Sequence, residues 1–426
     1  MKVHLYPERS TWASLLARPS LEAQDLDQIV ATVLDEVRKA GDTALKRYTA
    51  RFDHAQLDHI ALGTADLDAA EAQIPAALRQ AMQTAAANIS RFHEAQRHQG
   101  IEVETMPGVR CWRQSRPIEK VGLYIPGGTA PLFSTVLMLG IPAVLAGCRD
   151  IVLCTPPDPQ GNINPAIAYA ARLVGISQVF KVGGIQAIAA MAFGTETVPR
   201  VYKIFGPGNQ YVTAAKQAVS RLGVAIDMPA GPSEVMVCAD HTANPDFVAA
   251  DLLSQAEHGA DSQVVLLALK GCPVAAVQEA IERQLPALPR AEIARQALQN
   301  SLTIVPKNRG EALDLINAYA PEHLILAVEH AEDIAGQVLN AGSVFLGNYT
   351  PESVGDYASG TNHTLPTNGF ARAFSGVSLE SFQKNITFQQ LSLEGLQALG
   401  PAVEAMAHAE QLEAHRQAVR IRLETK

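Results

Sequence analysis

The chain has 426 residues, of which 47% are hydrophobic and 18% are charged, and its formal net charge is −9. This length exceeds one ordinary core, and the composition is typical of a soluble globular enzyme with two or more domains. An acidic balance without any Lys/Arg block argues against nucleic acid and against an anionic membrane as partners.

Three features favour a cytoplasmic location. The first ten residues contain charges and a proline but no apolar core, unlike a secretory signal. The most apolar stretch, 132–147, is short for a bilayer span and contains Pro142, which indicates a buried helix. Five dispersed cysteines form no CxxC pair, as expected of reduced thiols.

In chain order, residues 21–53 and 67–96 are predicted to be helical, because they are rich in Ala, Leu, Gln and Glu with apolar residues at helical spacing. From about residue 120, short β-rich runs alternate with helical patterns. These runs are almost continuously apolar, which predicts parallel sheets covered on both faces. The segment after about residue 380 is again helical and has no neighbouring strand, so we expect it to pack on another domain or a partner subunit.

Pro/Gly clusters at 125–128 and 228–232 mark candidate domain boundaries. We therefore expect an α/β protein with two Rossmann-like parallel-sheet domains, one inserted in the other, plus a helical N-terminal arm and a helical C-terminal tail. The expected parts are the arm (1–20), an α/β domain with the metal and acid/base residues (21–123 and 231–378), the inserted domain (124–230) and the tail (379–426).

Three Gly-rich turns follow predicted strands of the inserted domain, at 122–128, 182–190 and 204–212. Glycine lets backbone N–H groups approach a phosphate, and the next helix N-terminus supplies partial positive charge. None of the turns is GxGxxG, so a nucleotide would bind in an altered way, and each turn alone also fits a purely conformational role. The residues best placed to contact an adenosine or ribose are Tyr124, Gln186 and Asn209.

Asn244 and Pro245 predict the start of a helix that ends near Gly259. On that helix, Gln255 and His258 share one face at a spacing of three. Nitrogen and oxygen donors without thiolate suit zinc or manganese, and the pair could hold one cation. The alternative is the solvated face of an amphipathic helix.

Further along the chain, Glu322 and His323 are neighbours before a predicted strand and could act as general acid and base. The alternative is a helix cap beside a partly buried histidine. The long loop 349–367 holds Asp356, which could complete a metal site, and His363, which could contact substrate.

Ser233 precedes a strand and could hydrogen-bond a ligand, although no GxSxG surrounds it. In the tail, Glu410 and His415 lie five residues apart, which is no same-face helical spacing. A metal role for His415 therefore requires the tail to fold over a distant pocket.

Eight segments together resemble the histidinol dehydrogenase family: GLYIPGGTAPLFSTVLML, VGGIQAIAAMAFGTETVP, KIFGPGNQYVTAAK, DMPAGPSEV, DLLSQAEHG, APEHLI, GSVFLG and ESVGDYASGTNHTLPT. The likeness is most specific from about residue 115 to 385. It implies an enzyme of the final step of histidine biosynthesis, which oxidises L-histidinol to L-histidine through the aldehyde and uses NAD twice. It further implies a homodimer whose tail crosses to the partner.

The resemblance also implies roles for individual residues. Glu322 and His323 would be the catalytic acid/base pair, and Tyr124, Gln186 and Asn209 would contact NAD. One Zn²⁺ per subunit would be held by Gln255, His258, Asp356 and His415. Substrate would contact Ser233, His323, His363 and Glu410, together with the four metal ligands.

Two other chemistries remain open on the residues alone. A cysteine could form a thiohemiacetal, with Cys148 or Cys154 as the nucleophile, but both lie in apolar runs without an adjacent base. A metal-dependent binding or hydrolytic protein without redox chemistry would need the Gly-rich turns to be structural only.

Overall fold

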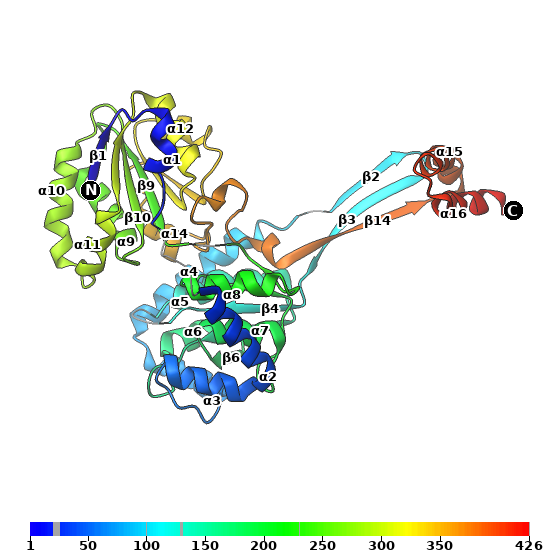
Figure 1. Ribbon diagram of the computed structural model, residues 1–426, viewed down its shortest axis with the longest axis horizontal. Coiled ribbons are helices and arrows are strands. Elements are labelled where there is room, and N and C mark those ends of the chain that lie inside the picture. The colour runs from blue at the N-terminus through cyan, green and yellow to red at the C-terminus, as the bar shows by residue number, and fades with distance from the viewer. Residues whose placement is uncertain (20–25, 99, 128–130, 230, 426) are drawn as a thin grey trace.

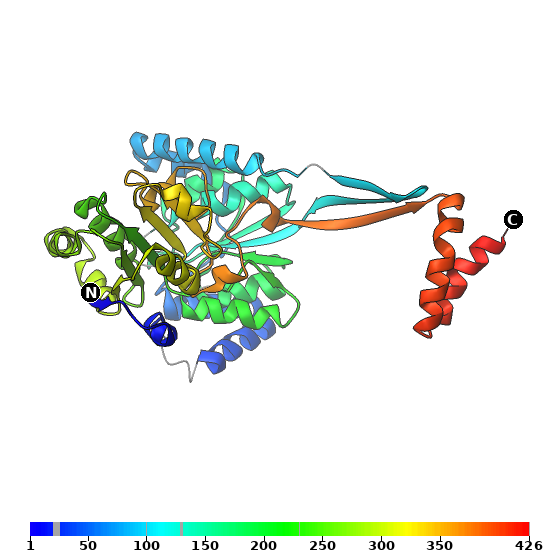
Figure 2. The same cartoon turned by 90° about the horizontal axis from the view of Figure 1, so that it is seen from above.

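The computed structural model describes residues 1–19, 26–98, 100–127, 131–229 and 231–425. Two α/β lobes form the body of the molecule, and a long arm extends from it to a separate helical tail (Figures 1 and 2). None of the helices in this described part combines the length and apolar character that a membrane span requires.

The first lobe is built on a parallel five-stranded sheet with the order β6-β5-β4-β7-β8. Its strands are β4 (Lys120–Tyr124), β5 (Asp150–Thr155), β6 (Gln178–Lys181), β7 (Lys203–Phe205) and β8 (Ala225–Ile226). The connecting helices are α5 (Phe133–Ala146), α6 (Pro165–Leu173), α7 (Gly184–Phe193) and α8 (Gln210–Ser220). The predicted Rossmann-like order is confirmed here, since two βα units wind in opposite directions from β4.

The second lobe contains a parallel six-stranded sheet with the order β1-β11-β10-β9-β12-β13. Its strands are β1 (Lys2–Leu5), β9 (Glu234–Ala239), β10 (Gln263–Ala268), β11 (Leu302–Val305), β12 (His323–Ala327) and β13 (Ser343–Leu346). Its helices are α1 (Trp12–Leu15), α9 (Pro245–Ala256), α10 (Val274–Gln284), α11 (Ala291–Gln299), α12 (Arg309–Tyr319), α13 (Ala331–Ala335) and α14 (Glu352–Tyr357). The same winding starts from β9, and the predicted N-terminal arm adds β1 as an outer strand.

The N-terminal helices are α2 (Leu26–Phe52), α3 (Thr64–Ala69) and α4 (Ala76–Glu94), and residues 21–25 of the predicted first helix lie outside the described residues. The predicted division grouped residues 21–123 with the second lobe. Instead, α2 packs on α7 and α8, and α4 packs on α5, so these helices cover the first lobe. An amphipathic helix shows in its sequence that one face is buried, but not against which sheet.

The arm is an antiparallel three-stranded sheet of β2 (Ile101–Met106), β3 (Val109–Pro117) and β14 (Gln383–Leu391). The predicted helical tail is present as α15 (Leu393–Ala409) and α16 (Glu413–Glu424), but β14 precedes it. This strand is largely exposed and lacks the continuous apolar run that marks the sheets of the body. Short 3-10 helices complete the fold at Arg9–Thr11, Ala70–Gln73, Leu285–Ala287, Phe370–Arg372 and Leu379–Phe382.

Candidate active site

The amino ends of β9 and β12 lie side by side at the edge of the six-stranded sheet, and His323 begins β12 there. Its side chain is 2% exposed. Nδ1 lies 3.1 Å from the carbonyl oxygen of Glu234, and Nε2 lies 3.3 Å from Oδ1 of Asp356. Because both partner atoms are acceptors, the imidazole is fixed in position and its charged form, which donates from both nitrogens, is favoured.

Glu322 is buried beside this ring, with Oε2 3.6 Å from Nδ1 of His323. The same oxygen accepts a 2.9 Å hydrogen bond from the backbone N–H of Glu234. Burial raises the pKa of Glu322. Burial lowers the pKa of His323, but the Glu322 and Asp356 carboxylates outweigh it and raise that pKa. The two groups therefore compete for a proton, as an acid/base pair requires.

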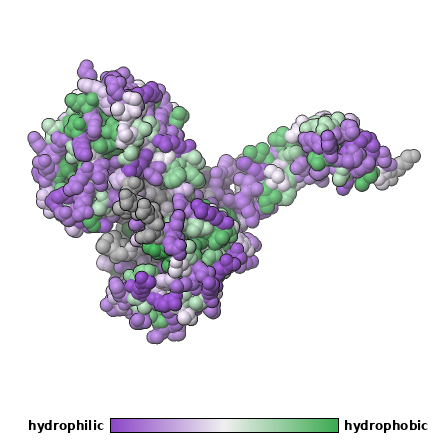
Figure 3. Space-filling model, in the orientation of Figure 1, coloured by the Kyte–Doolittle hydropathy of each residue, from purple (hydrophilic) through white to green (hydrophobic). Residues whose placement is uncertain are grey.

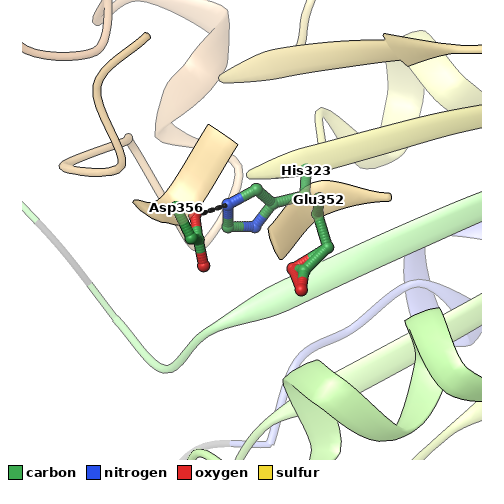
Figure 4. A group of neighbouring side chains, drawn as sticks. All are labelled: His323, Glu352 and Asp356. Atoms are coloured by element: carbon green, nitrogen blue, oxygen red, sulfur yellow. Dashed lines mark hydrogen bonds and ion pairs between the residues drawn. The ribbon is translucent and has the colours of Figure 1, made fainter. Parts of the chain in front are cut away.

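His323, Glu352 and Asp356 bring three possible metal-ligand atoms within 4.8 Å of one another (Figure 4). Gln255 reaches this group from α9, where its Nε2 donates to Glu352 and its Oε1 is buried without a partner in the described part of the chain. An unpartnered buried acceptor is costly, so this oxygen is positioned for a cation. The donor set of amide, carboxylate and imidazole fits zinc.

The predicted helix ends earlier than expected: α9 stops at Ala256, so Gln255 lies on the helix and His258 lies in the turn that follows it. Burial, aided by the Glu352 charge, raises the pKa of Asp251 to about 7. Burial acts to raise the pKa of Asp356, but the hydrogen bond and charge of His323, with smaller contributions from His363 and His258, lower it. Two of the four predicted metal ligands, Gln255 and Asp356, therefore belong to or directly contact the group of His323, Glu352 and Asp356.

The fourth ligand lies elsewhere. Glu410 caps the end of α15 and His415 lies in α16, both exposed at the far end of the arm. Figures 1 and 2 show this tail well separated from both lobes. One chain alone does not bring these two residues to the site.

Two further predicted residues border the site. Ser233 directly precedes β9, one residue before Glu234, whose backbone carbonyl accepts a hydrogen bond from Nδ1 of His323. His363 lies with Nδ1 2.9 Å from the carbonyl oxygen of Asp356 and Nε2 3.1 Å from Oγ1 of Thr135. Since Thr135 belongs to α5 of the first lobe, His363 joins the two lobes at this point.

A cavity of about 1360 Å³ opens at the carboxyl edge of the five-stranded sheet, and Tyr124, Gln186 and Asn209 all line it. The Tyr124 hydroxyl accepts a 3.1 Å hydrogen bond from the N–H of Gly184, at the start of α7. The Asn209 side chain caps α8, and Oε1 of Gln186 is buried without a partner among the described residues. Helix N-termini at a strand-order reversal are where such folds bind dinucleotides.

Residue-by-residue reading of the sequence missed Glu352 and the ion pair of Arg18 with Glu234. Arg18 donates from Nε and Nη2 to the two oxygens of Glu234, at 2.9 and 2.8 Å. This contact holds the strand end that supports His323. Glu352 precedes Asp356 by four residues, so helical spacing alone would have placed both on one face.

The chain combines a doubly wound sheet that has a cavity at its switch point with a buried carboxylate–imidazole pair, a combination typical of nicotinamide-dependent oxidoreductases. The fold and the site place the protein in this class of α/β dehydrogenases.

The chain belongs to the histidinol dehydrogenase family, whose family model matches residues 16–423. A histidinol dehydrogenase of Bacteroides thetaiotaomicron is 59% identical over 425 residues, covering 100% of this chain and 99% of that protein. One of Bacteroides fragilis is 58% identical over 424 residues, with the same coverage. The crystal structure of histidinol dehydrogenase from Elizabethkingia anophelis matches with a TM-score of 0.97 and 57% identity, covering 100% of this chain and 98% of that chain. The predicted enzyme class, an oxidoreductase of histidine biosynthesis, is confirmed.

Proposed function

We propose that this protein oxidises L-histidinol to L-histidine through the aldehyde, with NAD as hydride acceptor and one Zn²⁺ per subunit, as a cytoplasmic homodimer. The observation that carries the proposal is the His323 imidazole, buried between Glu322 and Asp356 and next to the unpartnered oxygen of Gln255. An acid/base pair that adjoins a metal-capable group can bind, orient and deprotonate an amino alcohol.

In the first oxidation, His323 takes the proton of the substrate hydroxyl as the carbinol C–H bond breaks. The Glu234 carbonyl and the Asp356 carboxylate hold the ring for this transfer and stabilise its charged form. In the second oxidation, Glu322 removes a proton from the water that attacks the aldehyde carbon. A buried carboxylate with a raised pKa is suited to that role.

Gln255, His258 and Asp356 of one subunit, with His415 of the partner subunit, would hold zinc, which would supply a Lewis acid that orients the amino and imidazole nitrogens of the substrate. Ser233, His323, His363 and the partner subunit's Glu410 would contact the remainder of the substrate. Tyr124, Gln186 and Asn209 would contact NAD, which would supply the hydride acceptor in both steps.

A second copy of the chain would account for the exposed apolar side chains of the three-stranded arm and the tail. Apolar side chains are exposed along the arm and over the tail (Figure 3), at Ile101, Val103, Ile386, Leu391, Leu393 and Met406. Near the site of the body, Tyr349 is 91% exposed and Val354 and Tyr357 are also open to solvent. Exposed apolar area of this extent is typical of an interface, so we expect the tail of the partner to dock beside α14.

The thiol alternative is disfavoured by the surroundings of both candidate cysteines. Burial raises the pKa of Cys148 to about 12 and raises that of Cys154 further. Thiols of this kind are poor nucleophiles at neutral pH.

The direct test is absorbance at the NADH band when purified protein, NAD and L-histidinol are mixed. We expect turnover, its loss after chelator treatment, and its return when zinc is restored. A hydrolytic or binding protein would give no NADH under any of these conditions, and that result would contradict the proposal.

Glu352→Gln should lower zinc affinity by about 10- to 100-fold, as expected when a residue that orients a metal ligand is changed. The ionised carboxylate only accepts, so it holds Nε2 of Gln255 towards itself and leaves Oε1 without a protein partner in the described part of the chain, where this oxygen would be free to bind zinc. A glutamine side chain at position 352 can both donate and accept, so it would pair with either orientation of the Gln255 amide. Zinc titration of the apoprotein measures the effect.

The matched control is Glu257→Gln, which removes a carboxylate from the end of α9 without touching that hydrogen bond. Unchanged zinc affinity in Glu352→Gln would mean that Gln255 is oriented by something else.

A further inference from the structure

Asp53 lies where α2 ends, and its side chain lines the cavity at the five-stranded sheet. Its backbone N–H continues the helix by donating to the carbonyl of Thr49 at 2.9 Å. The carboxylate has no such role, because its Oδ2 is buried without a hydrogen-bond partner in the described part of the chain. Gln186 lines the same cavity and is only 1% exposed. Its Oε1 is a second buried acceptor without a partner among the described residues. The cavity therefore offers acceptors to a ligand that donates hydrogen bonds.

The other carboxylates of the cavity are engaged by their own loops. Asp66 accepts from the N–H of Gly63 at 3.3 Å. Asp158 follows β5, the place from which this fold commonly reaches the adenosine ribose. Its Oδ1 instead closes a turn by accepting from the N–H groups of Gln160 and Asn162, at 3.0 and 2.8 Å. Among the carboxylates that line the cavity in the described part of the chain, Asp53 is thus the one left free for a ligand.

The position of Asp53 relative to the sheet identifies the part of the ligand that it meets. The segment after it pairs with the outer strand β6, through Lys181 N to Ile60 O and Leu62 N to Val179 O, both 2.8 Å. In a doubly wound sheet, a dinucleotide crosses at the reversal beside the central strand, and its adenosine half lies over the strands on the β5–β6 side. Asp53 and Tyr124, at the end of β4, line the same cavity. Burial raises the pKa of the Tyr124 phenol, and the negative charge of Asp53 adds to this increase.

We propose that Asp53 makes this site selective for NAD over NADP, by accepting a hydrogen bond from the adenosine ribose 2′-hydroxyl and repelling a 2′-phosphate. The inference rests on the proposed NAD site. Burial raises the pKa of Asp53 to about 6, so the carboxylate is mostly ionised at neutral pH. The cations that line the cavity are Arg51 and Lys181, and they are the groups that a 2′-phosphate would need to reach.

The experiment is calorimetric titration of the full-length protein with ADP-ribose and with ADP-ribose 2′-phosphate, neither of which requires turnover. We expect wild type to prefer ADP-ribose by about 100-fold, because the phosphate loses a charge-assisted hydrogen bond and meets a like charge. Asp53→Asn should weaken the binding of ADP-ribose by about tenfold. Its preference for ADP-ribose over ADP-ribose 2′-phosphate should fall to about tenfold or less. Asp68→Asn removes the same charge from a carboxylate that lies outside the cavity lining and pairs with Arg172 at 2.9 Å, and it should leave both affinities unchanged.

Equal binding of the two probes by wild type would overturn the proposal without any variant. So would an unchanged preference in Asp53→Asn, or a change of the same size in Asp68→Asn. Thermal unfolding shows whether Asp53→Asn is folded, and Asp53→Ser serves if it is not. Turnover of histidinol with NADP as readily as with NAD would refute selectivity and leave the proposed function standing. Absence of turnover with either dinucleotide refutes the proposed function alone.

Discussion

Glu322→Gln is expected to lower the rate of aldehyde oxidation by about 10²- to 10⁴-fold, the range over which a general base contributes. Glutamine keeps the shape of the side chain and an oxygen that can accept from the N–H of Glu234, so the strand end should stay in place. It cannot remove a proton from water. Oxidation of the alcohol depends on His323 and should fall much less. Single-turnover rates with histidinol and with the aldehyde separate the two steps.

Glu329→Gln is the matched control. Glu329 lies beyond the opposite end of the same strand, where its side chain is 58% exposed, and the change should leave both rates near wild type. Equal losses of the two half-reactions in Glu322→Gln would contradict the assignment, because a base for water attack has no part in removing the hydroxyl proton.

The sheets of the body were predictable because their strands are apolar along their whole length. Runs such as 234–239 and 263–268 are buried at every position, which a strand in a covered parallel sheet requires. Right-handed crossovers then limit the strand orders that such a chain can adopt. The docking of α2 and the strand β14 were not predictable in this way. Helix amphipathicity does not identify the sheet that is covered, and β14 is stabilised mainly by its pairing with β3, which lies more than 250 residues earlier.

The site was predictable where its residues share an element. Gln255 lies on the helix that its segment predicts, and Glu322 and His323 are adjacent in the chain, whereas His258 lies just past the end of α9. The role of Glu352 depends on contact between α9 and α14, which are about 100 residues apart and which no local pattern links. Asp53 was missed for a similar reason. Its role depends on the fact that Oδ2 is buried without a hydrogen-bond partner among the described residues, which no local sequence pattern indicates.

Mixing His258→Ala with His415→Ala is expected to restore activity, although each variant alone should be inactive for lack of a zinc ligand. If the tail crosses, a mixed dimer joins the intact His258 of one subunit to the intact His415 of the other, which completes one of its two sites. Random assortment makes half of the dimers mixed, so about a quarter of the wild-type activity should return. Co-refolding of the two purified variants, followed by the NADH assay and a zinc count, measures it.

His258→Ala mixed with Asp356→Ala provides the control. Both residues belong to the body of the same subunit, between α9 and α14, so no mixed dimer assembles an intact site and activity should stay absent. If the tail instead folded back onto its own body, the first mixture would fail as well, because each subunit would carry its own defect. The exposed position of His415 at the end of the arm, far from α14, favours the crossed arrangement. Recovery in the first mixture alone requires that the metal site be shared between two chains.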